Sequence, residues 1–590
     1  MESSSRIKTT RNVNTLDMYE KVMELCRRRG ILWSSFEIYG GLSGFVTYGP
    51  IGAVLKRNVE DKWREWFITK QGFVEIDSPV IMPQVVFKAS GHSDHFTDPM
   101  VGCLDCKKQY RADHLIENAI GKIVEGLSIE ELDGLIKENE ITCPDCGGSL
   151  GNVVLFNLMF RTTIGPYGGN IGYARPEAAQ GMFVDFKRVF SAKREQLPLG
   201  IAQIGRTFRN EISPRKGVIR LREFTIMEVE VFIDPSELTS CARLVDVENE
   251  ELAILTSDAQ QKEGHIEVVT AREAVRKGMV VSEWIAYFLV ISRSFVSSLG
   301  VPPEKQRFRE QLPWERAHYS KQTIDHQVLL ERFGWSEVAG HAYRTDWDLG
   351  RHMKFSGTDL RAFKQYERPK IVERTIIKPR LKAIRKRFGN ATGEILSFLK
   401  ESDPEMVQKT IKEDGFYPVG KNRVGPEHLT FDKRTEKVSG SRFIPHVIEP
   451  SFGADRLVYS ALEYAYSEKE KRVILKLPPA IAPIQIAVFP LLERDRLPEV
   501  AQKIYDMLLE EGFRTELDVS GSIGRRYARS DEIGIPIAVT VDYQSLEDDT
   551  VTIRNRDSWQ QLRNRIENLG RLFDGFFKGR IGFEKLGKTI

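Results

Sequence analysis

The chain has 590 residues, which is too long for a single hydrophobic core and indicates three to five domains. Hydrophobic residues make up 41% and charged residues 29%, as in an ordinary soluble globular protein, and the net charge of +3 requires any nucleic-acid contact to come from local patches. No apolar run is long enough for a transmembrane helix, and the N-terminus lacks the apolar core of a secretory signal, so we expect a cytoplasmic protein without membrane contact.

The N-terminal half of the chain alternates helix and strand patterns. Residues 15–30 have apolar positions at helical spacing and end at a glycine, and a second amphipathic helix is predicted from about Ala53 to Phe67. GFVEIDSPVIMP (72–83) alternates like a strand that is broken by its prolines. Residues 206–232, RTFRNEISPRKGVIRLREFTIMEVEVF, predict a β-hairpin with a basic loop.

The C-terminal half contains two insertions and a change of pattern. Helices are predicted over DPSELTSCARLVDVENEEL and REAVRKGMVVSEWIAYFLVISRSFVSSLG, and about 365–437 is charged and mixed. FIPHVIEPSFGADRLVYSALEYAY predicts a strand, a glycine turn and a helix. After the proline-rich KLPPAIAP, strands and helices alternate, which indicates a small α/β domain at the C-terminus.

Charged residues recur on single faces of the predicted strands. Side chains two residues apart share a face of a strand, and the pairs that do so are Arg175 with Glu177, Arg209 with Glu211, Arg222 with Phe224 and Glu228, and Glu449 with Ser451. One strand of this kind is equally well explained by surface ion pairs. Because four such strands occur in one chain, we expect a site for a polyanionic ligand that also carries an amine.

Four of the six cysteines form two C-x-x-C pairs. Cys103 with Cys106 and Cys143 with Cys146 are separated by 36 residues, and glycines follow the second pair. Two such pairs can enclose one ion in a closed tetrahedral site, so we expect structural Zn²⁺ rather than redox or incidental cysteines.

Several of these segments carry recognisable motifs. FRNE, RLREF and EPSFGADR resemble motifs 2 and 3 of the class II aminoacyl-tRNA synthetases, and GFVEIDSPVIMP resembles motif 1, the dimer-forming strand. More narrowly, GFVTYGPIGAVLKRN, RPEAAQGMFVDFKR, REFTIMEVEVF, FIPHVIEPSFG and GRRYARSDEIGIPIAVTVD resemble the glycyl-tRNA synthetases of the archaeal and eukaryotic dimeric type. The resemblance implies an α+β fold, with an antiparallel sheet flanked by helices, insertions, and a C-terminal α/β anticodon-binding domain.

This resemblance, together with the changes of pattern, gives a domain prediction. The expected segments are the first catalytic-core segment with motif 1 (1–102), a zinc-ribbon-like insertion (103–150), core with motif 2 (151–235), a helical insertion (236–303), core (304–364), a second insertion (365–437), core with motif 3 (438–478) and the anticodon-binding domain (479–590).

The resemblance also implies roles at an ATP site. Arg209 would hold the α-phosphate and the attacking carboxylate, and Glu211 would contact the adenine. Arg222 would face the phosphates, and Phe224 would stack under the base. On the other side of the adenine, Arg456 would meet the γ-phosphate, and Glu449 would hold Mg²⁺. The implied reaction is ATP-dependent glycyl-adenylate formation and transfer of the glycyl group to the 3′ end of tRNA(Gly) by a homodimer.

The amino acid itself must be selected by exclusion, because glycine has no side chain. Glu177 and Glu228 match the family's carboxylates for the glycine amine, and Ser451 matches its pocket-narrowing serine. Glu337 and Arg344 either line this pocket or form a structural ion pair. His92 and His95 are expected in a substrate-side loop or a hydrogen-bonded turn rather than on a metal.

Two basic segments are candidates for tRNA contact. Arg525, Arg526 and Arg529 stand near a predicted helix start in the C-terminal domain, where guanidinium groups suit phosphate, although a solvated basic turn would look the same. KPRLKAIRKRFG (378–389) in the second insertion is a weaker candidate for the acceptor arm.

Three other functions fit parts of this pattern. A synthetase for another small amino acid would lack the pairing of Glu177 and Glu228 with Ser451, and a zinc-ribbon nucleic-acid binder would explain only a small part of the chain. A non-catalytic nucleic-acid-binding subunit on the same scaffold would not need the ATP-site arginines, which are all present.

Overall fold

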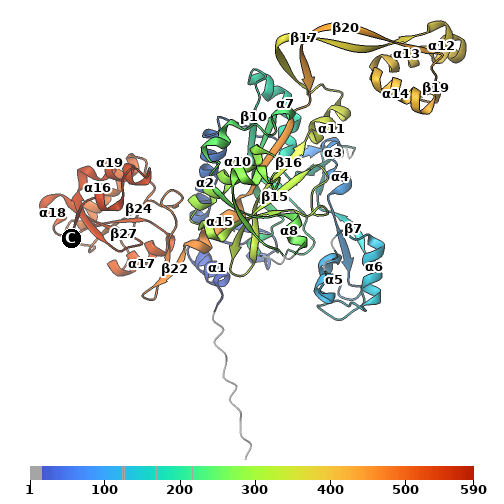
Figure 1. Cartoon of the computed structure of the whole chain (residues 1–590). Helices are drawn as coiled ribbons and strands as arrows, with labels where there is room; N and C mark the ends of the chain where they lie inside the picture. Colours follow the sequence, from blue (N-terminus) through green and yellow to red (C-terminus); the bar gives the residue numbers. More distant parts are fainter. Residues whose placement is uncertain (1–15, 123, 125, 167–168, 215–216, 263) are drawn as a thin grey trace, which may run out of the picture. The chain divides into compact units, whose positions relative to one another are not determined.

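The computed structural model describes residues 16–590 except 123, 125, 167–168, 215–216 and 263. It contains two compact units, Met1–Leu360 with Pro445–Ile590, and Arg361–Ile444 (Figure 1). The first fifteen residues of the predicted first domain lie outside the described residues. Within the described residues, no helix has the length and apolar character needed to cross a bilayer.

A nine-stranded sheet forms the centre of the first unit. Its strands, in spatial order, are β13 (Glu267–Thr270), β12 (Glu251–Leu255), β14 (Gln306–Glu310), β15 (Gln322–Leu330), β16 (Gly334–Thr345), β21 (His446–Gly453), β11 (Glu223–Ile233), β10 (Leu199–Phe208) and β3 (Val74–Glu75). Neighbouring strands are antiparallel except for β10 with β3 and β12 with β14. The predicted hairpin is confirmed as β10 and β11, which pair from Leu199↔Phe232 to Phe208↔Glu223.

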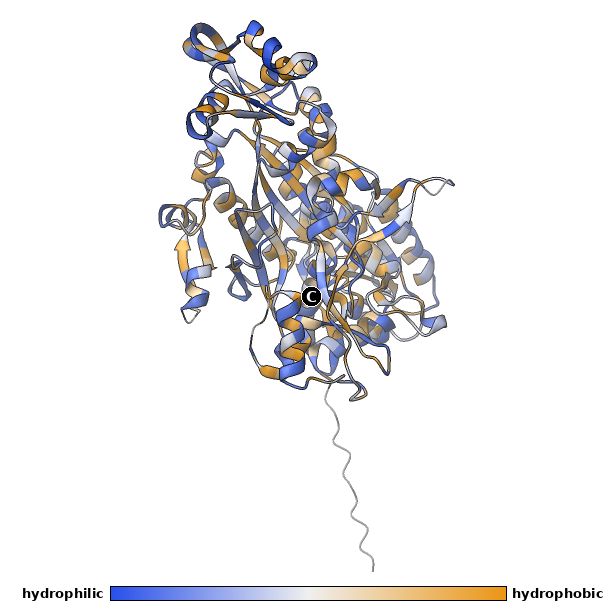
Figure 2. Ribbon diagram, turned by 90° about the vertical axis from the view of Figure 1, so that its right-hand side faces the viewer, coloured by the Kyte–Doolittle hydropathy of each residue, from blue (hydrophilic) through white to orange (hydrophobic). Residues whose placement is uncertain are grey.

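One face of this sheet is apolar. Met227, Val229 and Val231 of β11 and Phe452 of β21 are fully buried there. This face packs against α2 (Pro50–Arg64), α10 (Glu283–Ser298) and α15 (Ala454–Ala465), whose apolar residues belong to the same core cluster. Figure 2 shows helices that carry both hydrophobic and hydrophilic turns, as expected when one side of each helix is buried.

The opposite face is covered by α7 (Ala179–Ala192), whose Phe186 ring packs 4.4 Å from the Phe232 ring. The helix α11 (Trp347–Ser356) follows β16 directly and contacts α7. Between these helices and the sheet lie the buried charged residues of β11, β16 and β21. Alternation along each strand therefore separates an apolar core from a polar layer.

The remaining N-terminal elements flank the sheet. They are α1 (Met18–Arg28), β1 (Leu32–Ser34), β2 (Val46–Tyr48), β4 (Ile81–Pro83), α3 (Gln84–Ser90), α4 (His92–His95), β8 (Phe160–Thr163) and β9 (Ile171–Ala174). The helix α1 has a capping box between Asp17 and Glu20, as its sequence allows. The predicted strand over 72–83 is present only as β3 and β4, because the chain bends between them around Pro79.

The segment 236–303 differs from the helical insertion that its sequence suggested. The prediction of a helix over DPSELTSCARLVDVENEEL is wrong: short 3₁₀ turns, Pro235–Glu237 and Ala242–Asp246, are followed by β12. The reason is the apolar run Ala253–Leu255, which pairs beside β14 at the edge of the central sheet. Helices α8 (Ser257–Gln261), α9 (Ala271–Arg276) and α10 are present in the rest.

The cysteine-containing insertion has a small core of its own. Its elements are β5 (Thr97–Gly102), β6 (Gln109–Arg111), α5 (Ala112–Ile120), α6 (Ile129–Glu138) and β7 (Val154–Asn157). Val101, Ile116 and Leu132 are buried together with Cys103 and Cys143.

The C-terminal region is an α/β domain. Its six-stranded sheet has the order β25 (Thr515–Leu517), β24 (Ile486–Pro490), β26 (Ile537–Val541), β27 (Thr550–Asn555), β28 (Gln561–Arg565) and β29 (Lys588–Thr589). The helices α16 (Leu497–Glu510), α17 (Ile523–Ile533), α18 (Ser545–Asp548) and α19 (Leu569–Phe577) complete it, as the alternating pattern indicated.

The second unit is a long ribbon with a helical end. Strands β17 (Ala362–Pro379) and β20 (Leu429–Phe443) pair antiparallel. They carry α12 (Leu381–Phe388), α13 (Thr392–Glu401), α14 (Pro404–Asp414), β18 (Tyr417–Val419) and β19 (Asn422–Val424). Ile384, Ile395 and Val407 form its core. This unit begins and ends a few residues outside the predicted insertion of 365–437.

Candidate active site

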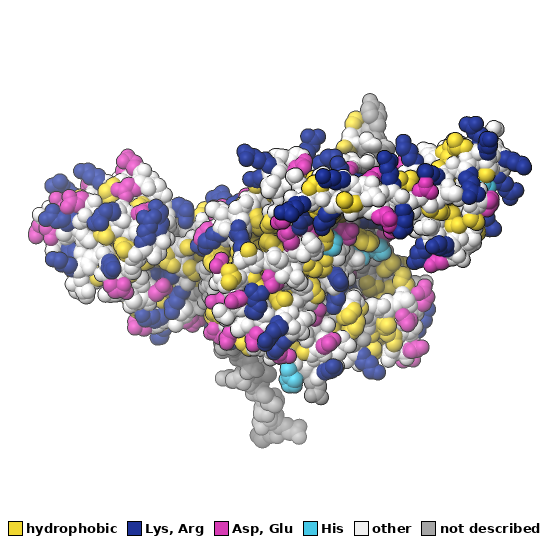
Figure 3. Space-filling model, turned by 45° about the horizontal axis from the view of Figure 1, so that its top comes forward, with side chains coloured by type: hydrophobic (Ala, Val, Ile, Leu, Met, Phe, Trp, Pro, Cys, Tyr) yellow, Lys and Arg dark blue, Asp and Glu magenta, His cyan; other side chains and the backbone are white. Residues whose placement is uncertain are grey.

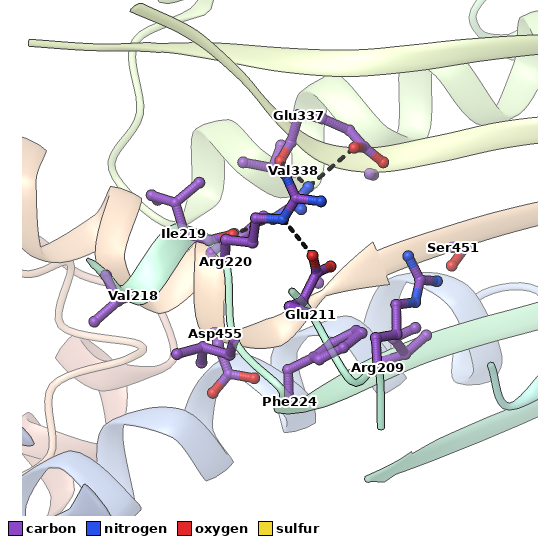
Figure 4. A pocket seen from close by; sticks show the side chains of 15 residues that line it. Arg209, Glu211, Val218, Ile219, Arg220, Phe224, Glu337, Val338, Ser451 and Asp455 are labelled. Carbon is purple, nitrogen blue, oxygen red and sulfur yellow. Dashed lines mark hydrogen bonds and ion pairs between the residues drawn. The ribbon is translucent and has the colours of Figure 1, made fainter. Parts of the chain in front are cut away.

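A pocket opens at the ends of β11 and β21, beside the loop that joins β10 to β11. The predicted residues that line it are Arg209, Glu211, Phe224, Ser451 and Arg456. Figure 4 shows the side chains of Arg209, Glu211 and Phe224 directed toward one space, with Ser451 beyond Arg209. Segments that are more than 240 positions apart in the sequence therefore meet here, although Arg209 and Glu211 lie in the loop after β10 and not on the strand face that the sequence pattern predicted.

Two of the arginines that line the pocket, Arg209 and Arg456, are held by backbone oxygens. Arg209 is half-buried, donates from Nε to the Pro176 carbonyl at 3.2 Å, and lies 5.3 Å from the centre of the Phe224 ring. Arg456 donates to the Ile219 carbonyl at 3.0 Å and to the Glu337 carboxylate at 3.0 Å. Both guanidinium groups are thus fixed in position at the wall of the pocket, where they can neutralise a polyanion.

Arg222 differs from its predicted position. It does not line the pocket, because β11 begins one residue later and Arg222 lies in a bend. Its guanidinium donates to the Glu211 carbonyl at 2.8 Å and to the Ser43 carbonyl at 2.9 Å, so it braces the loop. Arg220, which the strand pattern did not indicate, lines the pocket and pairs with Glu211 at 2.7 Å. The conformation of the loop determines that Arg220 and not Arg222 reaches the pocket, and sequence periodicity does not reveal a loop conformation.

A buried ion pair between Lys56 and Asp455 lies next to the pocket. Lys56 of α2 contacts Asp455 at 2.9 Å and the Thr225 hydroxyl at 2.8 Å. The backbone N–H of Thr225 donates to the second Asp455 oxygen at 2.7 Å. Burial raises the pKa of Asp455, but Lys56 outweighs it, so the pKa lies below its usual value. Asp455 therefore joins α2, β11 and the start of α15.

Next to this pocket lies an acidic niche formed by Glu177, Glu228 and Ser451. The Ser451 hydroxyl donates to Glu228 at 2.7 Å, because Glu228 and Ser451 are register partners on β11 and β21. The Ala178 N–H, at the start of α7, donates to the other Glu228 oxygen at 2.8 Å. This helix has no side-chain cap of its own, so the carboxylate from the neighbouring strand caps it and is stabilised by the helix N-terminus.

Arg344 is the cation of the niche. It is fully buried and contacts Asp348 at 2.9 Å, Glu449 at 2.8 Å and Glu177 at 3.4 Å. The pairing of β16 with β21 shifts register at Arg344, and such an irregularity re-aims a side chain. The Tyr319 ring lies 3.7 Å from the guanidinium. Of the two expected alternatives, Arg344 thus makes structural ion pairs at the niche, whereas Glu337 belongs to the Arg456 pocket.

Glu449 points into this niche and not into the pocket of Arg209 and Arg456. Burial, with Glu228 and Glu177 nearby, raises its pKa to about 8, although Arg344 opposes the shift. Glu177 shows the opposite result: burial raises its pKa, but His92 and Arg344 outweigh it and hold the pKa well below its usual range. Because Glu449 faces Arg344, it does not fit the predicted role of holding Mg²⁺ between phosphates in the pocket.

Sequence reasoning missed Glu230. It lies two residues after Glu228 on the same face of β11, is fully buried, and neither carboxylate oxygen has a hydrogen-bond partner among the described residues. Burial is the main cause that raises its pKa well above normal. One oxygen each of Glu228, Glu230 and Glu449 lies within 4.8 Å of the others. The E-x-E spacing in MEVEVF was the available signal.

The four cysteines of the insertion converge as predicted. Sγ of Cys103 lies 3.5 Å from that of Cys146, and Sγ of Cys106 lies 3.6 Å from that of Cys143. Tetrahedral Zn–S bonds of about 2.3 Å place sulfur atoms about 3.8 Å apart, so this donor set fits one zinc ion. The Tyr110 hydroxyl lies 3.1 Å from the Cys143 sulfur and donates its proton to the Asp145 carboxylate, so this side chain contacts the second pair.

The three arginines of the C-terminal domain that were predicted to contact tRNA have different surroundings. Arg526 is 2% exposed and donates to backbone carbonyls, including that of Gly521 at 2.8 Å. Arg529 pairs with Asp518, and Arg525 is exposed. The structure therefore leaves Arg525, and to some extent Arg529, available to a partner. His95 is also exposed, whereas His92 is buried and contacts Glu177 at 3.3 Å.

Comparison with known proteins identifies this arrangement. Residues 172–377 match the class II core domain of tRNA synthetases (G, H, P, S and T), and residues 485–574 match the anticodon binding domain. A glycine–tRNA ligase of Aeropyrum pernix is 50% identical over 97% of this chain and 99% of its own length. The chain belongs to the glycine–tRNA ligase family.

Other members of this glycine–tRNA ligase family are similar over the same extent. The ligases of Pyrococcus horikoshii and Methanothermobacter thermautotrophicus are 47% and 45% identical, over 94% and 95% of this chain and 98% of their own lengths. The matches confirm the expected α+β class II core with a C-terminal anticodon-binding domain, and they identify an aminoacyl-tRNA synthetase. A non-catalytic accessory subunit is not favoured.

Proposed function

We propose that this chain activates glycine with ATP and transfers the glycyl group from glycyl-adenylate to the 3′ end of tRNA(Gly). The observation that carries the proposal is that the arginine pocket and the acidic niche share one residue. Ser451 lines the pocket and also donates a hydrogen bond to Glu228 of the niche. With ATP in the pocket and the glycine amine in the niche, the glycine carboxylate would lie next to the α-phosphate that it attacks.

The first step needs no protein nucleophile. The glycine carboxylate attacks the α-phosphorus, the bond to the β-phosphate oxygen breaks, and pyrophosphate leaves. Arg209 would neutralise the α-phosphate and orient the carboxylate, and Arg456 would hold the far phosphates. Phe224 offers a flat ring for the adenine. Arg220 holds the Glu211 side chain, which would accept from the adenine amino group.

Arg222 acts differently in this proposal. Since its guanidinium is bonded to loop carbonyls, we assign it the task of holding the motif 2 loop and not of touching phosphate.

The niche would select glycine by its amine and its lack of bulk. Glu177 and Glu228 offer carboxylates to the ammonium group, and Glu449, placed beside them by Arg344, is a third candidate. Ser451, hydrogen-bonded to Glu228, closes the side where a Cβ would project. Larger amino acids are rejected by steric overlap, which needs no editing reaction.

Two metals enter the proposal in different ways. Class II synthetases use ATP with Mg²⁺, which supplies charge neutralisation between phosphates when bound, but we do not assign the ion to Glu449. Zn²⁺ is proposed at Cys103, Cys106, Cys143 and Cys146 as a structural ion, because the sulfur geometry fits a closed site. A chelator titration with metal analysis tests this, and a protein that contains no stoichiometric zinc as purified contradicts it.

Contacts to tRNA are proposed at two surfaces. In the C-terminal domain, Arg525 and Arg529 remain candidates and the buried Arg526 does not. In the second unit, residues 378–389 supply basic side chains, and Figure 3 shows many Lys and Arg side chains on that unit. Replacing Arg525 by Ala should weaken tRNA binding and reduce its salt dependence, without changing glycine activation.

We also propose a cytoplasmic homodimer. Ile81 and Val85, in the motif 1 region, are exposed at 44% and 53%, and an exposed apolar pair of this kind suits a subunit interface. Analytical ultracentrifugation tests this, and a monomer at micromolar concentration would contradict it.

The decisive test is ATP–pyrophosphate exchange with glycine, with alanine and serine as controls. Exchange with glycine alone supports the proposal. Exchange with another amino acid would change the substrate, and no exchange with any of them would instead indicate a non-catalytic role.

A further inference from the structure

A histidine stands directly behind the glycine niche. His92 is 4% exposed, and its Nε2 lies 3.3 Å from Oε2 of Glu177. Its Nδ1 lies 2.8 Å from the Ser90 hydroxyl. The imidazole is surrounded by the rings of Phe87, Phe96, His318 and Tyr319, with centroids 5.7–6.4 Å away.

The chemistry of these partners fixes the direction of the hydrogen bonds. An ionised carboxylate only accepts, so Nε2 must carry a proton and donate it to Glu177. In the neutral ring Nδ1 then accepts from the Ser90 hydroxyl. The proton donors therefore run in one direction, from the Ser90 hydroxyl to His92 and from His92 to Glu177, and each group orients the next.

The two oxygens of Glu177 are held by different groups. Oε1 accepts from Gln180 at 2.8 Å and from Arg344 at 3.4 Å, whereas Oε2 contacts His92. Without the imidazole, the carboxylate could rotate toward Arg344 and away from the position that the niche offers to an amine. In a buried site such a hydrogen bond to an ion is stronger than in water.

The local backbone is built to place this ring. Gly91 has φ +91°, and a Cβ at this position would come within 2.7 Å of Nε2 of His318. The turn at Gly91 ends α3 and starts α4, and Nε2 of His318 donates to the Ser90 carbonyl, 2.9 Å away. Two loops, around residues 91 and 318, are therefore joined behind the niche.

A hydrolytic triad is excluded by the same geometry. Ser90 is fully buried, so its hydroxyl cannot reach a substrate. It also faces Nδ1, while the carboxylate faces Nε2 and belongs to the substrate niche.

We propose that His92, held by Ser90, is a positioning residue that fixes the Glu177 carboxylate for the α-ammonium group of glycine and so sets the affinity for the amino acid. This inference rests on the proposed glycine niche. His92 itself does not touch the substrate.

The test is the steady-state kinetics of ATP–pyrophosphate exchange, with glycine and ATP varied separately. His92→Ala should raise KM for glycine about tenfold or more, the equivalent of one lost charge-assisted hydrogen bond, with KM for ATP within about twofold of wild type. Ser90→Ala should raise the glycine KM by a smaller factor, because the ring remains but is less constrained.

Two amide variants separate positioning from mere filling of space. The longer amide side chain introduced by His92→Gln can place N–H near the former Nε2, so this variant should keep the glycine KM within about threefold of wild type. His92→Asn places its amide near the former Nδ1 and should behave like His92→Ala. Asp94→Ala is the matched control, because Asp94 is exposed and lies in the same short helix, and it should leave both KM values unchanged.

The outcomes distinguish this inference from the proposed function. If the wild-type protein shows no exchange with glycine, the proposed function fails. If wild type exchanges and His92→Ala keeps its glycine KM, or if the Gln and Asn variants are equally impaired while their thermal unfolding matches wild type, the positioning role is overturned.

Discussion

The two faces of the central sheet are built from the same strands and serve opposite purposes. On β11, Met227, Val229 and Val231 face the apolar core, while Glu228 and Glu230 face the niche. On β21, Phe452 faces the core, while Glu449 and Ser451 face the niche. Both layers are nearly inaccessible to water, yet one contains mainly apolar groups and the other contains several ionisable ones.

The difference shows which region of the chain is optimised for stability and which for binding. Burying apolar surface stabilises the fold directly, by about 25 cal/mol per Å² of area removed from water. Buried carboxylates are costly unless they are paired, and the niche has more carboxylates than Arg344 can neutralise. Such an arrangement is expected where a cationic ligand supplies the missing positive charge.

The largest effect is expected from Arg344→Met. Removing this guanidinium leaves Glu177, Asp348 and Glu449 without their cation, so glycine-dependent exchange should fall at least about 10³-fold and stability by about 3–5 kcal/mol. Exchange kinetics and thermal unfolding measure both. The control Arg272→Met breaks exposed ion pairs and should cost no more than about 1 kcal/mol. Equal effects of the two variants would contradict the comparison.

On the apolar face, Phe452→Ala should reduce stability by about 3–5 kcal/mol. The ring is fully buried against Phe67 at 4.7 Å and Phe295 at 5.6 Å, so truncation leaves a cavity. Urea unfolding followed by tryptophan fluorescence checks this. Phe355→Ala, at a position that is 43% exposed, serves as the control and should change little.

Arg209→Ala should separate activity from stability. We expect kcat for exchange to fall about 10²–10³-fold, because one preorganised charge at the α-phosphate is lost, while the thermal unfolding midpoint stays unchanged. Arg206→Ala, with an exposed side chain at the same end of β10, should keep its activity. A fully active Arg209→Ala variant would remove this arginine from the proposed mechanism.

The smallest effect concerns His341, a polar residue on the apolar face. It is fully buried, neither ring nitrogen has a partner among the described residues, and burial lowers its pKa to about 3. The unfolded chain binds a proton below about pH 6.5 and the folded chain only below about pH 3, so folding stability decreases as pH falls through this window.

Replacing His341 by Phe removes this proton linkage. Between pH 7 and pH 5, the free energy of unfolding of this variant should fall by about 2 kcal/mol less than that of wild type. Urea unfolding at both pH values measures this difference. The same acid sensitivity in both proteins would show that the imidazole is protonated in the folded core.

Sequence patterns predicted what depends on periodicity and on recognisable motifs. The alternation in REFTIMEVEVF and IEPSFGADR placed Phe224, Glu228 and Ser451 at one site, and the spacing of the cysteine pairs placed four sulfurs together. Both follow from local geometry. The roles assigned to these residues remain predictions.

What depends on tertiary context could not be read in the same way. Arg222 and Arg220 exchange places because a bend precedes β11, and Arg344 enters the niche through a register shift. Arg526 is buried although its neighbour Arg525 is exposed, because the Arg526 guanidinium donates to the Pro490 carbonyl at the end of β24. Strand β12 was missed because its parallel partner β14 lies much further along the chain, where Ile254 pairs with Phe308, and with it the edge strand β13, which pairs only with β12.

The ion pair of Lys56 and Asp455 has a consequence for biosynthesis. The two residues are 399 positions apart, so the floor of the nucleotide pocket cannot close until nearly four-fifths of the polypeptide has left the ribosome. At about 5–20 residues per second, this interval lasts roughly 20–80 s. Until β21 and α15 have been synthesised, α2 and, once it is made, the hairpin of β10 and β11 carry apolar surface that these later elements cover in the folded core.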